Sequence, residues 1–165
     1  CAGCSTGEEA YTLLMLIMEH FGHEYNLWDA GLLATDISAP ALAKARAGVY
    51  PEEAVSLLPP NLKRKYFLAL PGGDLSVNDL LKRELTFRRF NFMNPVFPFK
   101  KPFDVIFCRN VMIYFDRPTR DALVRRFHHF TEPGGYLFIG HSESLQRDTC
   151  PYDYVMPAVY RKEGK

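Results

Sequence analysis

The sequence has no long apolar run. Its longest, Leu13–Met18, is far shorter than the roughly 20 residues that a membrane-spanning helix needs. Nothing in the sequence resembles a secretion signal. We therefore expect a cytoplasmic protein that does not insert into a membrane.

Cysteines are few, and their spacing does not form a dense disulfide framework. The four thiols suit a reducing compartment. Cys1 and Cys4 form a C-x-x-C pattern with His20 and His23 downstream, which has to be weighed as a zinc pattern. The two histidines stand at the short edge of zinc-finger spacing, and the intervening residues are better explained as a ligand-binding loop and a helix. We expect no metal.

A strong excess of either charge is also absent. The formal net charge is +1, so no strong field draws the whole protein to nucleic acid or to an anionic membrane. Apolar residues make up 47% and charged residues 24% of the chain, which is typical of a globular protein. The length suits a single domain over residues 1–165. We expect no nucleic-acid partner.

What the sequence does contain is an alternation of helix and strand patterns. Helices are predicted from helix formers, starting prolines and closing glycines at Glu8–Phe21, Pro40–Ala47 and Pro118–Phe130. Strands are predicted from apolar runs at Leu32–Asp36, Phe103–Cys108, Tyr136–Ile139 and Tyr154–Arg161. The alternation predicts an α/β fold, with a mostly parallel sheet and helices on both faces. Ligands of such sheets bind at the carboxyl ends of the strands.

Residues 50–92 interrupt this alternation. The turn signal Pro71–Gly73 and short alternating stretches such as Leu85–Phe87 predict an inserted helix and hairpin. The basic run Lys63–Lys65 within it is more typical of a solvated face than of a docking patch for an acidic partner.

A loop of small residues, Ala2–Gly7, leads into the first helix. Gly3 and Gly7 allow close approach of the backbone to a ligand, and the helix N-terminus offers unpaired N–H groups. A phosphate fits poorly, because no Lys-Ser/Thr follows Gly7 and two carboxylates, Glu8 and Glu9, would repel it. S-adenosylmethionine fits better, since its sulfonium or ammonium group would face one of them. The alternative is that both acids only complement the helix dipole.

This loop follows almost no residues of a strand, so we expect the chain to lack its natural beginning.

Polar residues follow two of the predicted strands. Asp36 ends the first, where nucleotide-binding sheets carry a carboxylate that accepts hydrogen bonds from ribose hydroxyls. Arg109, Asn110 and Tyr114 follow the strand Phe103–Cys108 and would lie at the mouth of the same site. Taken without context, each also has an ordinary structural explanation: an ion pair with a surface carboxylate for Arg109, a turn for Asn110, and packing at the edge of the core for Tyr114.

Three long strings resemble, in this order, the chemoreceptor glutamate methyltransferase family known as CheR: AGCSTGEEAYTLLM, ATDIS followed by LAKARAGVY, and FDVIFCRNVMIYFD. The resemblance extends over essentially the whole chain, including PGGYLFIGHSESL and the closing YRK. It implies a Rossmann-like class I methyltransferase, with a mostly parallel seven-stranded sheet whose first strand is truncated here and a small inserted antiparallel β-subdomain. It also implies an N-terminal helical domain that this sequence lacks.

The resemblance also implies roles for individual residues. Those on the cofactor would be Gly3, Gly7, Glu9, Asp36, Asn91, Phe92, Arg109 and Asn110, with Asp36 at the ribose and Asn91 and Phe92 beside the adenine. Arg109 and Tyr114 would be catalytic, with Tyr114 near the transferring methyl group.

The implied reaction is methyl transfer from S-adenosyl-L-methionine to glutamate carboxylates of methyl-accepting chemotaxis proteins, which leaves S-adenosyl-L-homocysteine. The partner would be the cytoplasmic helical bundle of the receptor. Two alternatives stay open: a regulatory domain that binds the cofactor without transfer, and a class I methyltransferase with another substrate. A nucleic-acid substrate is disfavoured, because Arg109–Met112 replaces the Asn/Asp-Pro-Pro-aromatic motif of nucleic-acid amino methyltransferases.

Overall fold

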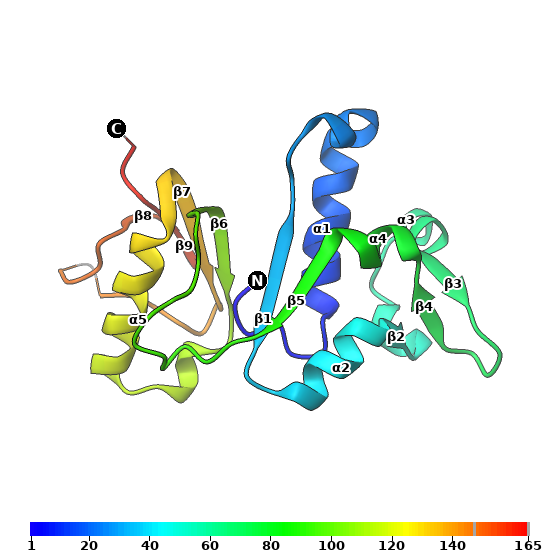
Figure 1. The fold of residues 1–165 in the computed structure, drawn as a ribbon, viewed down its shortest axis with the longest axis horizontal. Coiled ribbons are helices and arrows are strands. Elements are labelled where there is room, and N and C mark those ends of the chain that lie inside the picture. The colour runs from blue at the N-terminus through cyan, green and yellow to red at the C-terminus, as the bar shows by residue number, and fades with distance from the viewer. Residues whose placement is uncertain (147, 165) are drawn as a thin grey trace. The chain divides into compact units, whose positions relative to one another are not determined.

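The structure is a computed structural model that describes residues 1–146 and 148–164 (Figure 1). The chain divides into two compact units, one of Gly3–Phe90 with Cys1 and one that runs from Asn91 onward together with Ala2. Each unit combines helices with strands, which confirms the predicted α/β class. Among the described residues, none of the helices has both the length and the apolar character needed to cross a membrane.

The first unit is built on a pair of parallel strands. β1 (Leu32–Asp36) pairs with β5 (Leu85–Arg89), with Asp36 opposite Arg89. Three α-helices contact this pair: α1 (Glu8–Phe21), α2 (Ala39–Ala47) and α4 (Asp79–Glu84). A 3-10 helix, η1 (Gly22–Leu27), follows α1. The fully buried core side chains include Tyr11, Leu14, Met15, Leu42 and Leu81.

The insert forms a three-stranded antiparallel sheet in the order β2-β4-β3 (Figure 1). Its strands are β2 (Val49–Tyr50), β3 (Phe67–Ala69) and β4 (Leu75–Val77), and its helices are η2 (Glu52–Val55) and α3 (Pro60–Tyr66). The stretch Leu85–Phe87, expected in the inserted hairpin, belongs to β5 instead and pairs with β1. Its alternation arises because Leu85 and Phe87 are buried while Thr86 is exposed.

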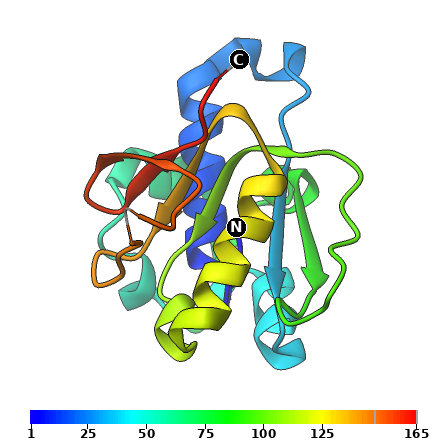
Figure 2. The ribbon, with the colours of Figure 1, turned by 90° about the vertical axis from the view of Figure 1, so that its left-hand side faces the viewer.

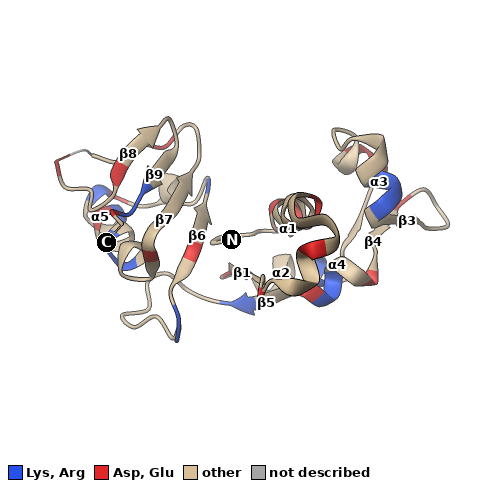
Figure 3. Ribbon diagram, turned by 90° about the horizontal axis from the view of Figure 1, so that it is seen from above, with Lys and Arg blue, Asp and Glu red and all other residues tan. Residues whose placement is uncertain are grey.

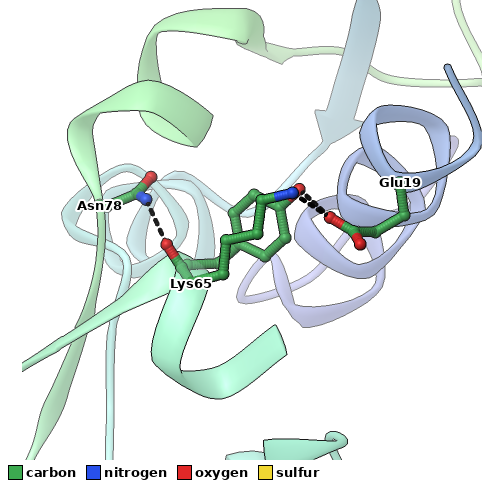
Figure 4. Close-up of polar contacts among 4 residues, drawn as sticks. Glu19, Lys65 and Asn78 are labelled. Atoms are coloured by element: carbon green, nitrogen blue, oxygen red, sulfur yellow. Dashed lines mark hydrogen bonds and ion pairs between the residues drawn. The ribbon is translucent and has the colours of Figure 1, made fainter. Parts of the chain in front are cut away.

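Both lysines of the basic run on α3, which is blue in Figure 3, contact neighbouring carboxylates. Lys63 Nζ lies 3.8 Å from Glu52 Oε1. Lys65 Nζ lies 2.5 Å from Glu19 Oε1, and Tyr66 Oη donates to the same oxygen at 2.6 Å (Figure 4). The bonds from Lys65 and Tyr66 hold the pKa of the Glu19 carboxyl below its ordinary value. Lys65 and Tyr66 thus join the insert to α1.

The second unit contains a four-stranded sheet in the order β6-β7-β9-β8. Its strands are β6 (Phe103–Cys108), β7 (Thr131–Ile139), β8 (Asp153–Met156) and β9 (Val159–Arg161). β6 and β7 are parallel, and β9 is antiparallel to both β7 and β8. α5 (Arg117–His129) lies beside β7 (Figure 2), and a short 3-10 helix, η3 (Met112–Tyr114), follows β6.

The expected final strand is in fact a hairpin. β8 and β9 cover most of Tyr154–Arg161 but are separated by a turn in which Ala158 has a positive φ of 66°. Only the β9 half pairs with β7. The prediction of a turn at Pro133–Gly135 before the strand is also wrong, because these residues lie within β7.

Candidate functional site

The glycine loop is hydrogen-bonded to the carboxyl end of β1. Gly3 N–H donates to Thr35 O at 2.8 Å, and Ser5 N–H donates to Asp36 Oδ2 at 2.8 Å. Gly3 and Gly7 have φ values of 80° and 98°, which glycine adopts without a steric penalty. The loop is therefore fixed at the strand end where α/β sheets bind ligands.

Gly7 is required by space as well as by conformation. A Cβ atom there would lie 2.9 Å from Ala45 Cβ and 3.0 Å from Tyr50 Oη. Tyr50 Oη donates to Thr6 O at 2.7 Å and so fastens the loop to the insert. Burial, and then the charge of Glu8, raises the pKa of Tyr50 well above its usual value, so its hydroxyl stays protonated at neutral pH.

Asp36 bonds to the glycine loop with one carboxylate oxygen and to the start of α2 with the other. Oδ2 accepts from Ser5 N–H and Oδ1 accepts from Ser38 N–H, each at 2.8 Å. A carboxylate has about four lone-pair sites, so each oxygen keeps one further acceptor position. The side chain can accept hydrogen bonds from two ribose hydroxyls without giving up the loop, which is the chemistry expected of it.

Glu8 and Glu9 point to different neighbours. The Glu8 carboxylate accepts from Thr6 Oγ1 at 2.7 and 2.8 Å, within the loop itself. Glu9 Oε2 lies 3.8 Å from Cys1 Sγ, and the Cys1 carbonyl accepts from Thr35 N–H of β1 at 2.9 Å. Glu8 is thus bonded within the loop, whereas Glu9 lies next to Cys1, whose carbonyl is bonded to β1.

In the second unit, Arg109, Asn110 and Tyr114 lie in the short segment that follows β6. Asn110 has a positive φ of 57°, and Arg109 is half-buried. Tyr114 ends η3 and is 79% exposed. The segment therefore combines a cation, an amide and an accessible phenol at the carboxyl end of a parallel strand.

Asn91 and Phe92 open the second unit and differ in accessibility. Asn91 is half-buried, and its Oδ1 accepts from Met93 N–H at 2.9 Å. Phe92 is 8% exposed and packs edge-to-face on Phe127 of α5, with ring centroids 5.7 Å apart. Of these two residues predicted beside the adenine, Asn91 is the more available to a ligand.

Glu143 was not predicted as a site residue. It is 8% exposed, and its carboxylate accepts from the backbone N–H groups of Gly140, Asn110 and Ile113 at 2.6, 3.0 and 3.2 Å. Carboxylates are common in loops, so the string HSES gave no signal by itself. The one local sign is Gly140 three residues earlier, because Glu143 N–H closes a turn onto its carbonyl at 2.9 Å.

The C-x-x-C pattern is not assembled into a metal site. Cys4 is 3% exposed, whereas the side chain of His23 is 95% exposed and lies 4.0 Å from Glu24. Within residues 1–146 and 148–164, no group of three or more His, Cys, Asp or Glu side chains is placed to hold a metal ion.

We expect Cys4 to resist alkylation in the native protein. Burial raises the pKa of its thiol to about 11, so almost no reactive thiolate exists at pH 8. Mass spectrometry after iodoacetamide treatment should find Cys4 unmodified until a denaturant is added. The half-buried Cys150 serves as the internal comparison. Labelling of Cys4 at the same rate as Cys150 would contradict this prediction.

Comparison with known proteins places the chain in one family. A family model described as "CheR methyltransferase, SAM binding domain" matches residues 1–159. A chemotaxis protein methyltransferase of Borreliella burgdorferi is 45% identical over 98% of this chain and 56% of its own length. That of Escherichia coli is 38% identical over 87% of this chain and 51% of its own length.

Solved structures resemble the chain more distantly. An N-methyltransferase of Bradyrhizobium japonicum in complex with S-adenosyl-L-homocysteine is 15% identical, with a TM-score of 0.48 over 84% of this chain and 48% of that one. The chain spans about half the length of the curated relatives it matches. On the match of the family model and on these identities, the chain belongs to the CheR methyltransferase family and corresponds to its S-adenosylmethionine-binding domain.

Proposed function

We propose that the full protein transfers a methyl group from S-adenosyl-L-methionine to glutamate carboxylates of methyl-accepting chemotaxis proteins. The observation that carries this proposal is the 45% identity, over 98% of the chain, to a protein named chemotaxis protein methyltransferase. The partner would be the cytoplasmic helical bundle of the receptor, engaged with the help of an N-terminal helical domain. A cytoplasmic location follows from that partner.

The residues of the first unit fit the cofactor. Asp36 keeps one acceptor position on each oxygen for the ribose hydroxyls. Glu9 would face the positively charged ammonium or sulfonium, and Gly3 and Gly7 would let the loop backbone approach the ligand. The absence of a phosphate-binding Lys-Ser/Thr after Gly7 agrees with a cofactor that carries no phosphate.

The residues of the second unit fit the remaining tasks. Asn91 and Phe92 would lie beside the adenine, and Asn110 would line the pocket with Arg109. Arg109 would hold the substrate carboxylate or the cofactor through charge-assisted hydrogen bonds. Tyr114, which is 79% exposed, would contact the methyl group and orient it.

The proposed chemistry needs no general base. S-adenosylmethionine supplies an electrophilic methyl group when it is bound. A glutamate side chain, with a reference pKa of about 4.3, is already ionised at neutral pH. What the protein must do is align the carboxylate oxygen with the methyl group and remove water from it. Arg109 and Tyr114 suit that task, because neither has to take up a proton.

Transfer of labelled methyl groups to a receptor cytoplasmic fragment tests this proposal. We expect the full-length protein to form a base-labile methyl ester. Arg109→Ala should lower its initial rate at least about tenfold, because a hydrogen bond to a charged group contributes about 1.5–3 kcal/mol. The matched control is Arg125→Ala, an exposed arginine of α5, which should leave the rate unchanged.

The outcomes separate the competing functions. Binding of S-adenosyl-L-homocysteine without any base-labile label would favour a regulatory domain. Label that resists base, on a substrate other than a receptor, would indicate a different methyltransferase. Failure of the full-length protein to bind S-adenosyl-L-homocysteine would overturn the proposal.

A further inference from the structure

The carboxylate of Glu143 is enclosed by backbone donors from two segments. Oε2 accepts from Gly140 N–H at 2.6 Å and from Asn110 N–H at 3.0 Å, and Oε1 accepts from Ile113 N–H at 3.2 Å. The residue is 8% exposed. A buried carboxylate with three backbone donors is a fixed point to which two chain segments are fastened.

One of these segments carries the residues proposed for transfer. The two donors Asn110 and Ile113 lie between Arg109 and Tyr114, so the bonds to Glu143 fix the backbone on which both side chains stand. Asn110 has a positive φ of 57°, a conformation that is uncommon outside glycine, although asparagine adopts it more readily than most residues, and that surrounding contacts help to hold. Its N–H bond to Glu143 is such a contact.

The other segment is built to admit the carboxylate. A Cβ atom at Gly140 would lie 2.8 Å from Glu143 Oε2 and 3.0 Å from Asn110 N. Only glycine leaves room for the carboxylate and the Asn110 backbone at this point. β7 ends at Ile139, so Gly140 places the carboxylate directly after a parallel strand that pairs with β6.

We propose that Glu143 is a positioning residue for methyl transfer: its carboxylate holds the Arg109–Tyr114 segment in the conformation that aligns substrate and cofactor. This proposal rests on the proposed function, because it assumes that Arg109 and Tyr114 act in transfer. Glu143 itself touches neither substrate nor cofactor in this scheme. It acts only through the backbone N–H groups that it accepts.

The chemistry of the site demands a carboxylate. All three neighbours are donors, and an ionised carboxyl group is acceptor-only. In Glu143→Gln the amide oxygen can serve the two donors at Oε2, but the NH₂ group then faces Ile113 N–H. In Glu143→Asp the charge is kept on a side chain one methylene shorter. The glutamine variant should thus release one end of the segment, and the aspartate variant should restore part of its function.

The first test measures the segment itself by amide hydrogen exchange in the full chain. We expect the amide of Ile113, which loses its acceptor, to exchange at least about tenfold faster in Glu143→Gln, a change of about 1.4 kcal/mol in protection. The amides of Asn110 and Gly140 should show a smaller increase, because their acceptor loses its charge. The amides of β1 and β5 in the first unit should be unaffected. The matched control is Glu132→Gln, the same change at a half-buried position of β7.

The second test measures catalysis in the full-length protein. At saturating S-adenosylmethionine, and well below the unfolding midpoint of each variant, we expect Glu143→Gln to lower kcat at least tenfold with a smaller change in the KM for receptor fragment. Glu143→Asp should recover part of kcat. A residue that only stabilises the fold would change the unfolding midpoint and leave kcat intact at this temperature.

Combining the two tests separates this proposal from the one on which it rests. Unchanged exchange of the three amides in Glu143→Gln overturns the positioning role, whatever the activity. Faster exchange with unchanged kcat also overturns it, since the segment would then move without affecting transfer. If Glu143→Gln exchanges faster but the wild-type protein forms no methyl ester, the proposed function is refuted. The result would then show only that Glu143 stabilises the Arg109–Tyr114 segment.

Discussion

Asp36→Ala should weaken the binding of S-adenosyl-L-homocysteine by about 100-fold or more. A hydrogen bond to a charged group contributes about 1.5–3 kcal/mol, and every 1.4 kcal/mol is tenfold in affinity. The alanine variant loses the proposed ribose acceptors, the bond from Ser5 that fixes the glycine loop and the bond from Ser38 at the start of α2. Isothermal titration calorimetry measures the change directly.

Two further variants make this result specific. Asp29→Ala removes an exposed carboxylate from the residues just before β1, and it should leave affinity unchanged. Asp36→Asn keeps the shape but turns an NH₂ group toward Ser5 or Ser38, so it should fall between wild type and Asp36→Ala. An affinity of Asp36→Ala equal to that of the wild type would rule out the ribose assignment.

Gly7→Ala should lower the free energy of unfolding by about 2–5 kcal/mol. A side chain in the left-handed region costs roughly 1–2 kcal/mol, and overpacking adds about 1–3 kcal/mol. The added Cβ atom would meet Ala45 Cβ at 2.9 Å and Ala45 Cα at 3.1 Å, so relief requires movement of α2. Urea unfolding measures the loss of stability. Binding of S-adenosyl-L-homocysteine to the folded variant serves as a second readout.

Gly72→Ala is the matched control for this prediction. Gly72 has a φ of 96°, close to the 98° of Gly7, but a Cβ atom there meets nothing within 4 Å. Gly72→Ala should therefore lower the free energy of unfolding only by the cost of a side chain in the left-handed region, roughly 1–2 kcal/mol. Equal destabilisation by Gly7→Ala and Gly72→Ala would show that α2 can move away from the glycine loop at no cost in free energy. That result would contradict the close packing of Gly7 against α2.

Elements with strong local signals could be predicted from the sequence. α1 begins at Glu8 and ends at Phe21 as expected, because Gly22 closes it with an N–H bond to Met18 O. β1 and β6 also have the expected bounds, since short apolar runs between turns have few alternatives. Such signals lie within a few residues of the element that they define.

Pairing partners could not be predicted in the same way. Leu85–Arg89 alternates like a hairpin strand, but its partner β1 lies some fifty residues earlier in the chain, and nothing local specifies a parallel partner. Tyr154–Arg161 is largely apolar, and the hairpin is evident only from the structure, in the antiparallel pairing of β8 with β9 and the positive φ of Ala158.

The residues of the candidate site also differ in whether their signal is local or depends on distant residues. Gly7 and Asp36 were predicted because their chemistry can be recognised from neighbouring residues. Glu143 was missed because its meaning depends on donors at Asn110 and Ile113, about thirty residues away. The role of such a buried carboxylate can be recognised only when its hydrogen-bond donors are known from the structure.

The Glu19 contacts bear on how the insert can be exchanged between relatives. Lys65 and Tyr66 belong to the insert, but the oxygen that both of them contact belongs to α1. A chimera that transplants residues 50–84 alone would leave Glu19 behind and strip the tyrosine hydroxyl of its acceptor. Tyr25 likewise donates to Glu84 at 3.2 Å. A portable module is therefore discontinuous, because positions 19 and 25 have to travel together with the grafted segment.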